Sequence, residues 1–389
     1  MRVFWTFHAL NLSGHFFLAG DLMDEQYMRR ALKLAKKGEG FTNPNPLVGA
    51  VIVKNGEIVG EGFHALYGEH HAEINALFNA GEQAKDATMY VTLEPCSHHG
   101  KTPPCTKAII KSGIKRVVIA SNDPNPLVSG RGVKELQDAG IEVESGILEE
   151  ENKRLNEIFF HYIVKGRPFV ILKTAMSADG KTATKTGDAK WITNEKSRRF
   201  VHELRHRVQA IMVGVKTVIA DNPLLTARLP NKKVRHPIRI VLDTCAETPL
   251  ESNVLKNTES TRTIVAVTKG ANEENIEALK RKGAEVWVMP TKDGHVDLQA
   301  LVKALGEESI DSVLLEGGSF VNDSAFKAGI IQRFHLFIAP KIIGGDAAFT
   351  PVGGIGVNTV AEGAKLKRTN METFDEDVLI TYDVESGAI

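Results

Sequence analysis

The sequence predicts two successive α/β domains, and three observations lead to that fold class. The chain has 389 residues, which is more than one hydrophobic core usually organises. Short apolar stretches typical of strands alternate with amphipathic stretches typical of helices along most of its length. A charged helix then leads into Gly166, Arg167 and Pro168, where the alternation restarts. We therefore expect one domain over residues 23–167 and a second over residues 168–389.

The first domain is expected to be a sandwich of helices on a mixed sheet. Asp24 is a candidate N-cap of its first helix, which ends near Gly38 and Gly40. Asn55 and Gly56 have the composition of a hairpin turn between two strands. Helices are expected at 72–80, 106–112, 133–139 and 148–163, and strands at 47–53, 57–63, 88–93, 116–120 and 141–144. Alternation of strands and helices after a hairpin predicts this α/β architecture.

The second domain continues the alternation without a Rossmann fingerprint. Strands are expected from Phe169 and at 210–213, 238–242, 263–267, 285–289, 312–315 and 334–338. No G-x-G-x-x-G follows a strand, and the glycines of 353–356 lack that spacing. Residues 316–319, Glu-Gly-Gly-Ser, lie instead between an expected strand and helix. Glycines there let a phosphate approach free N–H groups, although Gly-Gly before a helix is often only a turn.

Charge and composition narrow the function classes. Lys plus Arg and Asp plus Glu balance at 48 each without a basic run, which disfavours a nucleic-acid partner but not a small phosphorylated substrate. No stretch approaches the roughly 18 apolar residues of a membrane helix. Three cysteines suit a reducing cytoplasm better than a disulfide framework. Residues 1–22 only faintly resemble a signal sequence, so we interpret them as an extension, with Met23 the native start.

Three pieces of sequence predict a catalytic metal site. His71-Ala72-Glu73 opens a helix, Cys96 follows a strand, and Cys105 precedes another helix. One imidazole and two thiolates form a three-ligand zinc set that leaves a fourth position open for water, as catalytic sites do. From the same helix start, Glu73 can reach that position and carry protons. His98 or His99 is an alternative ligand, and an H-x-E triplet or a cysteine pair alone would be weak evidence.

These motifs resemble the cytidine and deoxycytidylate deaminase superfamily, whose signature is H-x-E followed by P-C-x-x-C. Here eight residues rather than two separate Cys96 from Cys105. With that insert, the run 92–105 resembles the bifunctional riboflavin-biosynthesis deaminase–reductase family. The same resemblance is carried by residues 45–51, 123–128, 177–181, 191–193, 214–223 and 316–319, and it extends from about Met23 to near the C-terminus.

The resemblance implies a fold and a reaction for each domain. A cytidine-deaminase-like α/β/α sandwich would use one Zn²⁺ to deaminate 2,5-diamino-6-ribosylamino-4(3H)-pyrimidinone 5′-phosphate. A dihydrofolate-reductase-like α/β domain would then use NADPH to reduce the ribosyl chain, giving 5-amino-6-ribitylamino-uracil 5′-phosphate. The implied zinc ligands are His71, Cys96 and Cys105, and the implied proton shuttle is Glu73. The family is usually homo-oligomeric, and we expect the same here.

The resemblance also implies contact residues, each of which could instead be an ordinary loop or surface residue. Substrate contacts in the deaminase are expected at Asn45, His64, Lys101 and Asn125. Cofactor contacts in the reductase are expected at Ala175, Trp191, Thr217, Asp221, Thr244 and Gly318, and substrate contacts at Ala189, Arg205, Leu225, Arg228 and Glu316. Lys101 suits a phosphate as a point charge, and the two arginines suit it as forked cations. Candidates for the reductase proton donor are Asp179 and Glu316.

Two other functions remain open from the residues alone. A nucleic-acid base deaminase would have to hold the backbone that flanks a flipped base, which the neutral charge balance disfavours. A zinc-stabilised interaction module would need a fourth protein ligand to close the metal site.

Overall fold

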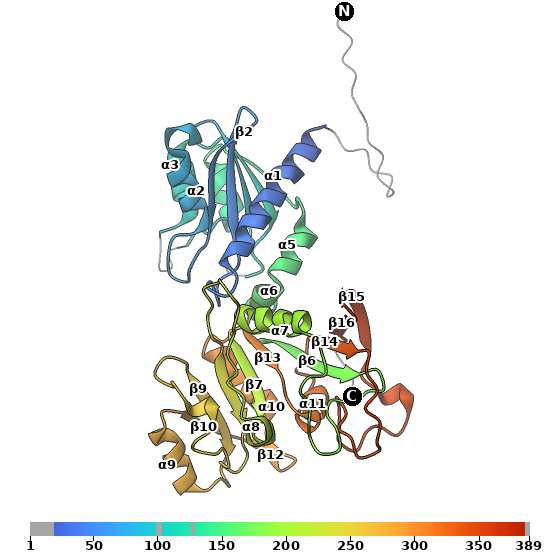
Figure 1. Ribbon diagram of the computed structural model, residues 1–389. Coiled ribbons are helices and arrows are strands. Elements are labelled where there is room, and N and C mark those ends of the chain that lie inside the picture. The colour runs from blue at the N-terminus through green and yellow to red at the C-terminus, as the bar shows by residue number, and fades with distance from the viewer. Residues whose placement is uncertain (1–18, 99–102, 126–128, 386–389) are drawn as a thin grey trace, which may run out of the picture. The chain divides into compact units, whose positions relative to one another are not determined.

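The computed structural model describes residues 19–98, 103–125 and 129–385 (Figure 1). The chain divides into two compact units, Met1–Val164 and Lys165–Ile389. The expected extension over residues 1–22 lies largely outside the described residues. Within the described ranges, we find no helix of the length and apolarity needed to span a membrane.

The first unit is built on a five-stranded mixed sheet. Its strands are β1 (Gly49–Lys54), β2 (Glu57–Phe63), β3 (Thr88–Leu93), β4 (Arg116–Ser121) and β5 (Glu142–Ser145), in the order β2-β1-β3-β4-β5. Strand β1 runs antiparallel to β2 and β3, whereas β3, β4 and β5 are parallel. The predicted hairpin and mixed sheet are therefore confirmed.

Helices cover both faces of this sheet because successive strand residues point to opposite sides. Val51 and Val53 face α1 (Ala19–Ala35). Ala50 and Ile52 face the opposite core, to which α2 (Ala72–Ala80), α3 (Cys105–Ser112) and α4 (Arg131–Asp138) contribute. The first unit is thus an α/β/α sandwich, as predicted.

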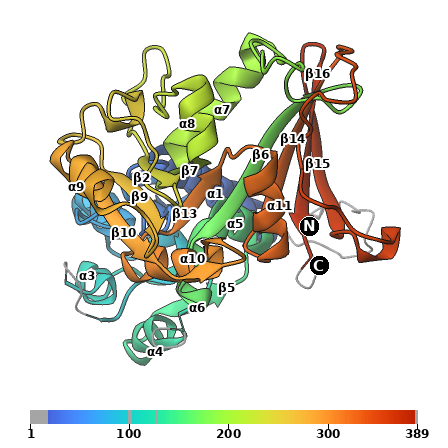
Figure 2. The same ribbon diagram turned by 90° about the horizontal axis from the view of Figure 1, so that it is seen from below.

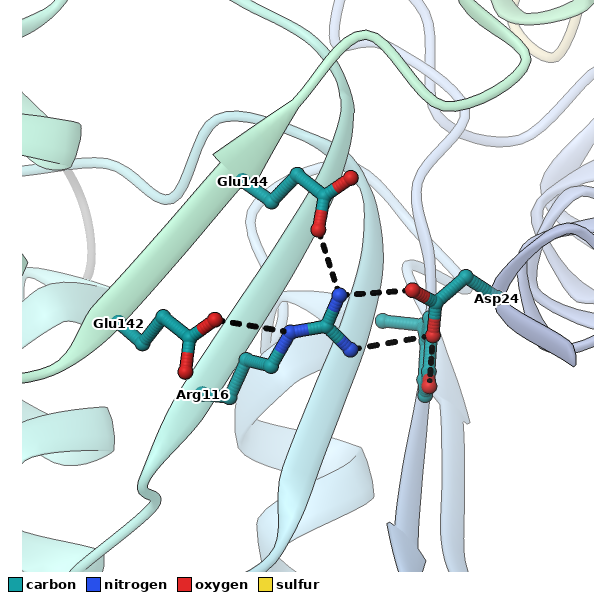
Figure 3. Close-up of polar contacts among 5 residues, drawn as sticks. Asp24, Arg116, Glu142 and Glu144 are labelled. Carbon is teal, nitrogen blue, oxygen red and sulfur yellow. Dashed lines mark hydrogen bonds and ion pairs between the residues drawn. The ribbon is translucent and has the colours of Figure 1, made fainter. Parts of the chain in front are cut away.

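Two local predictions in this unit were wrong. Helix α1 begins at Ala19, so Asp24 lies within it and caps nothing. Its carboxylate instead accepts hydrogen bonds from Tyr90 and Arg116 (Figure 3). The helix expected at 148–163 is two helices, α5 (Glu149–Leu155) and α6 (Glu157–Lys165). They separate at Asn156, whose amide bonds the backbone N–H and C=O of Leu47 at 2.8 and 3.0 Å.

The second unit contains a nine-stranded sheet (Figure 2). Its order is β10-β9-β8-β7-β13-β6-β14-β16-β15, and the strands are β6 (Phe169–Ser177), β7 (Ala210–Gly214), β8 (Ile238–Leu242), β9 (Thr263–Thr268), β10 (Glu285–Met289), β13 (Ser312–Leu315), β14 (Arg333–Ala339), β15 (Leu366–Phe374) and β16 (Asp377–Val384). Strands from β10 to β14 in this order are parallel, and β16 and β15 close the edge as an antiparallel pair. A separate small hairpin joins β11 (Thr291–Lys292) to β12 (His295–Val296).

Two apolar cores flank the parallel part of this sheet. One includes residues of α10 (Leu298–Glu307) and α11 (Ser319–Lys327), and the other includes residues of α8 (Val215–Asp221) and α9 (Glu273–Arg281). A smaller core joins α7 (Glu195–Arg207) to β14 and β16. Short 3₁₀ helices occur at Lys36–Gly38, Gly81–Ala84, Asn253–Leu255 and Val360–Glu362. Because β6, β7, β8 and β13 are parallel, their carboxyl ends share one edge, where α/β sheets usually bind ligands.

Candidate active sites

The three predicted metal ligands meet at two helix starts in the first unit. His71 is the residue before α2, Cys105 is the first residue of α3, and Cys96 lies in the loop after β3. His71 Nδ1 lies 3.6 Å from Cys96 Sγ and 3.3 Å from Cys105 Sγ. The Cys105 backbone N–H also points at Cys96 Sγ, at 3.4 Å. Free N–H groups at a helix start stabilise nearby negative charge, which favours thiolates here.

This spacing fits a tetrahedral zinc ion. Zn–N and Zn–S bonds of about 2.0 and 2.3 Å at the tetrahedral angle place nitrogen and sulfur about 3.5 Å apart. All three donor atoms lie within 4.8 Å of one another, and among the described residues no fourth His, Cys, Asp or Glu belongs to the group. His98 is outside the cluster, and His99 is outside the described residues. Among the described residues, the donor set is therefore that of a site with one open position.

Glu73 lies beside this cluster on the first turn of α2. Its side chain is only 3% exposed, and burial raises the pKa of its carboxyl group. The Cys105 thiol, together with His71, lowers the pKa of Cys96 through hydrogen bonds. The arrangement thus brings a buried carboxyl group to the ligands without making it one of them.

A cavity of about 290 Å³ opens onto the ligands and gathers most of the predicted deaminase residues. Its lining includes Asn45, His64, His71, Glu73, Cys96 and Asn125. His64 Nδ1 lies 3.1 Å from the His70 carbonyl, so that nitrogen carries the proton, and Nε2 accepts from the Asn45 amide at 3.2 Å. Burial lowers the pKa of His64, consistent with a neutral ring that orients Asn45. Lys101 lies outside the described residues.

Sequence reasoning missed several residues that line the same cavity. Asp123 and Glu94 contribute carboxylates, and Phe159 contributes an apolar wall from α6. Burial raises the pKa of Asp123. Asp123 and Glu94 both lie inside motifs that identified the family, but neither motif assigns them a role. Their separation of 29 residues gives no local signal that they share a site.

In the second unit, four predicted cofactor residues lie at the carboxyl edge of the parallel strands. Ala175 is near the end of β6, Thr217 is on α8 directly after β7, and Thr244 follows β8. Gly318 is the N-cap residue of α11, after β13. A Cβ atom placed on Gly318 would come 3.6 Å from Thr217 Oγ1, so these two residues adjoin. This common edge brings together residues that are up to 143 positions apart in the sequence.

The predicted reductase substrate residues include a buried ion pair. Arg205 on α7 donates two hydrogen bonds to the Glu316 carboxylate, at 2.7 and 2.9 Å, and their side chains are only 14% and 13% exposed. Arg228 bonds Thr226 Oγ1, and Thr226 offers its carbonyl to Arg205. The forked face of Arg205 is already occupied by Glu316. The Arg228 side chain is the more exposed of the two arginines, so its guanidinium is the more accessible to a ligand.

Two residues beside this pair were missed. Burial lowers the pKa of Lys173 on β6, although Glu316 opposes that shift. Burial together with the charges of Arg205 and Arg228 lowers the pKa of His202 to about 4, so its ring is neutral near pH 7. A single lysine within an apolar strand and a histidine within an arginine-rich helix have no motif spacing that would have singled them out.

Neither predicted proton donor holds a proton near neutral pH. Asp179 accepts hydrogen bonds from Ser177 Oγ and the amides of Ile343 and Gly344, which lower its pKa to about 2. Burial would raise the pKa of Glu316, but Arg205 and Lys173 outweigh it and lower that pKa to about 2. Lys173 is the neighbouring basic group, and the Glu316 carboxylate raises its pKa against the lowering by burial.

The remaining predicted residues lie in loops or at helix ends. Trp191 is 61% exposed, and the Arg198 guanidinium lies 4.6 Å from its ring centre. Leu225 is buried at a positive φ of 52°. Ala189 is half-buried in the loop after β6, and Asp221 is exposed at the end of α8.

Comparison with known proteins accounts for almost the whole chain. Residues 22–121 match the cytidine and deoxycytidylate deaminase zinc-binding region, and residues 168–380 match the RibD C-terminal domain. The riboflavin biosynthesis protein RibD of Actinobacillus pleuropneumoniae is 52% identical over 94% of this chain and 96% of its own length.

Solved structures of relatives show the same similarity over almost the whole chain. Acinetobacter baumannii RibD superposes with a TM-score of 0.85 at 37% identity, covering 94% of this chain and 99% of that one. A Thermotoga maritima diaminohydroxyphosphoribosylaminopyrimidine deaminase/5-amino-6-(5-phosphoribosylamino)uracil reductase gives a TM-score of 0.82 at 41% identity, with the same coverage of both chains. All three zinc ligands fall inside the matched zinc-binding region.

Proposed function

Since the chain belongs to the RibD family of bifunctional riboflavin-biosynthesis deaminase–reductases, we propose the substrate and cofactor of each half. The first unit deaminates 2,5-diamino-6-ribosylamino-4(3H)-pyrimidinone 5′-phosphate. The second unit uses NADPH to reduce the ribosyl chain of the product, giving 5-amino-6-ribitylamino-uracil 5′-phosphate. The names of the solved relatives support this assignment.

One observation carries the deaminase half: two of the three clustered ligands, His71 and Cys96, line one cavity with the buried Glu73, and Asn45 and Asn125 line it too. Zinc held by the three ligands supplies Lewis acidity that lowers the pKa of water towards neutrality. As the water oxygen bonds to the ring carbon and the bond to the amine breaks, Glu73 would carry one proton of the water to the ring nitrogen and the other to the leaving amine, which departs as ammonia. His64 holds the Asn45 amide so that it meets the substrate in one orientation. Lys101 is our proposed phosphate contact.

The proposal for the reductase half rests on the charged side chains of Arg205, Glu316 and Lys173. NADPH supplies the hydride. Thr217 and Gly318, which adjoin at the start of α11, bind the cofactor phosphates together with the first-turn amides. Ala175, Trp191, Asp221 and Thr244 complete the proposed cofactor site, and Ala189, Arg205, Leu225, Arg228 and Glu316 the proposed substrate site. Arg228 meets the ribose phosphate, and Lys173, which is buried near Glu316, is our proposed donor of the proton that the ribose ring oxygen takes up when the ring opens.

The decisive experiment separates the two reactions. Wild-type protein with zinc and NADPH is given the diaminopyrimidinone nucleotide, and ammonia release and NADPH oxidation are followed separately. Glu73→Gln keeps the shape of the side chain but cannot carry the proton, so ammonia release should fall by a factor on the order of 100 or more. Reduction of the supplied deaminated intermediate should stay within twofold of wild type. Equal loss of both activities would contradict independent sites.

We also propose a cytoplasmic homo-oligomer that binds no nucleic acid. The low, odd count of three cysteines, two of which are proposed zinc ligands, supports a reducing compartment. Light scattering of the purified protein tests the assembly. A salt-sensitive gel shift with RNA would contradict the proposal that the protein binds no nucleic acid.

A further inference from the structure

The carboxylate of Glu94 stands out because four backbone N–H groups donate to it. Glu94 follows β3 directly and is 4% exposed. Its Oε1 accepts from Gly132 and Val133 at 2.9 and 3.3 Å. Its Oε2 accepts from Asp123 and Gly130 at 3.2 and 3.0 Å. All four partners are donors, so both oxygens act as acceptors.

These four amides belong to both ends of one connection, the loop between β4 and α4. Asp123 lies just after β4, and Gly130 to Val133 form the N-cap and first turn of α4. Glu94 thus fastens the two ends of the loop to the end of β3. The first turn of α4 is also packed closely against the segment after β3, because a Cβ atom on Gly132 would come within 2.1 Å of the Pro95 carbonyl oxygen.

The same loop carries two residues of the deaminase cavity. Asp123 and Asn125 line the cavity beside the zinc ligands. The Asn125 backbone N–H donates to Asp123 Oδ1 at 2.8 Å, so the Asp123 side chain is held against the Asn125 backbone. A carboxylate that holds the Asp123 backbone therefore also sets the distance of Asn125 from the metal ligands.

We propose that Glu94 is a positioning residue for the deaminase: it holds the β4–α4 loop so that Asp123 and Asn125 present their polar groups to the pyrimidine ring of the substrate. The proposal rests on the proposed function for the identity of that ring. A purely structural role, capping the first turn of α4, would stabilise the unit without affecting substrate binding.

Glu94→Gln tests the proposal. The substituted amide keeps one acceptor oxygen but turns an NH₂ group towards two N–H donors, so two of the four bonds are lost. With the diaminopyrimidinone nucleotide, kcat/KM for ammonia release should fall about 100-fold, the order expected for a contact displaced by about 1 Å. Most of the loss should appear in KM. Zinc should stay at one per chain, and reduction of the supplied intermediate should stay within twofold of wild type.

Amide hydrogen exchange provides a readout that does not need activity. Exchange of a peptide covering residues 121–133 should quicken at least tenfold in Glu94→Gln. Glu94→Asp keeps both acceptor oxygens one methylene shorter, and should give intermediate KM and exchange values. It also provides the test if Glu94→Gln fails to fold.

Asp243→Asn is a matched control, because Asp243 is likewise a buried carboxylate that accepts bonds from a turn, at Glu247 and Thr248. It should leave deaminase KM and the exchange of residues 121–133 unchanged.

Three results would overturn the proposal: a KM within twofold of wild type in Glu94→Gln, unchanged exchange of the loop, or loss of zinc and reductase activity in parallel with deamination. A wild-type chain that releases no ammonia from this nucleotide would instead overturn the proposed function. The exchange measurement would then decide alone whether Glu94 fastens the loop.

Discussion

Replacing Arg116 by methionine tests how much the ion pair between Arg116 on β4 and Asp24 on α1 stabilises the first unit (Figure 3). Arg116 on β4 donates to both oxygens of Asp24, at 3.1 and 2.7 Å, and to Glu144 at 2.5 Å. The side chains of Arg116 and Asp24 are 22% and 11% exposed, so solvent screens their pairing only weakly. Methionine conserves most of the buried volume and leaves Asp24 with one hydrogen bond, from Tyr90.

The expected loss of unfolding free energy at pH 7 is about 3–5 kcal/mol, the usual cost of removing one partner from a buried ion pair. Glu142→Gln is the control. Glu142 touches the same guanidinium at 3.6 Å with a side chain that is 70% exposed, so its removal should cost under about 0.5 kcal/mol. Urea unfolding of the full chain, followed by circular dichroism and by deaminase activity, measures both.

The pH dependence has a defined sign. Burial alone would raise the pKa of Asp24, but hydrogen bonds from Arg116 and Tyr90 lower it below the usual 3.8. In wild type this stability is present above the unfolded pKa and is lost as the pH falls through the folded pKa. In Arg116→Met, burial is the main influence on Asp24 and raises its pKa, so protonation of Asp24 removes a buried unpaired charge. The difference in unfolding free energy between wild type and variant should therefore narrow as the pH falls towards about 4. A cost under about 1 kcal/mol at pH 7, or a gap that does not change with pH, would refute the reasoning.

Three further predictions concern other contacts. Asn156→Ala leaves the buried N–H and C=O of Leu47 without their side-chain partner and should cost about 2–4 kcal/mol in urea unfolding; a cost near zero would show that the helix break does not depend on Asn156. Glu316→Gln removes the charge that raises the pKa of Lys173, so the high-pH limb of the reductase rate profile should move to lower pH; an unmoved limb would exclude Lys173 as the proton donor. Removing zinc with a chelator should abolish ammonia release and leave NADPH oxidation with the supplied intermediate intact, and added zinc should restore the first activity; parallel loss of both would contradict separate sites.

The sequence predicted those parts of the fold whose signal is local. Strands such as β3 and β9 are short, mostly apolar and bounded by polar turns, so their limits were placed within a residue or two. The metal ligands were found because imidazole, thiolate and an adjacent carboxylate each follow an element boundary, where side chains converge in α/β folds.

The parts that were missed depend on partners distant in sequence. Strand β15 is exposed along almost its whole length, so its charged and polar residues lack the alternation that marks a half-buried strand. Neither β15 nor its partner β16 was predicted from the sequence. The break at Asn156 is set by Leu47, 109 residues away. Asp24 is a good helix cap by composition, yet Arg116, 92 residues away, determines where its carboxylate lies. At Asn156 and Asp24, local propensity is overridden by a long-range polar contact.

Two strand-end glutamates show how the same position in an α/β topology can serve different chemistry. Glu94 follows β3 and Glu316 follows β13, and both carboxylates are largely buried. The partners of Glu94 are backbone amides, which do not titrate, so its contacts depend on the geometry of one loop. The partners of Glu316 are Arg205 and the nearby Lys173, so each changes the pKa of the others. We infer that backbone amides suit a site where a ring must be oriented, and that coupled charges suit a site where a proton must be held until the substrate needs it.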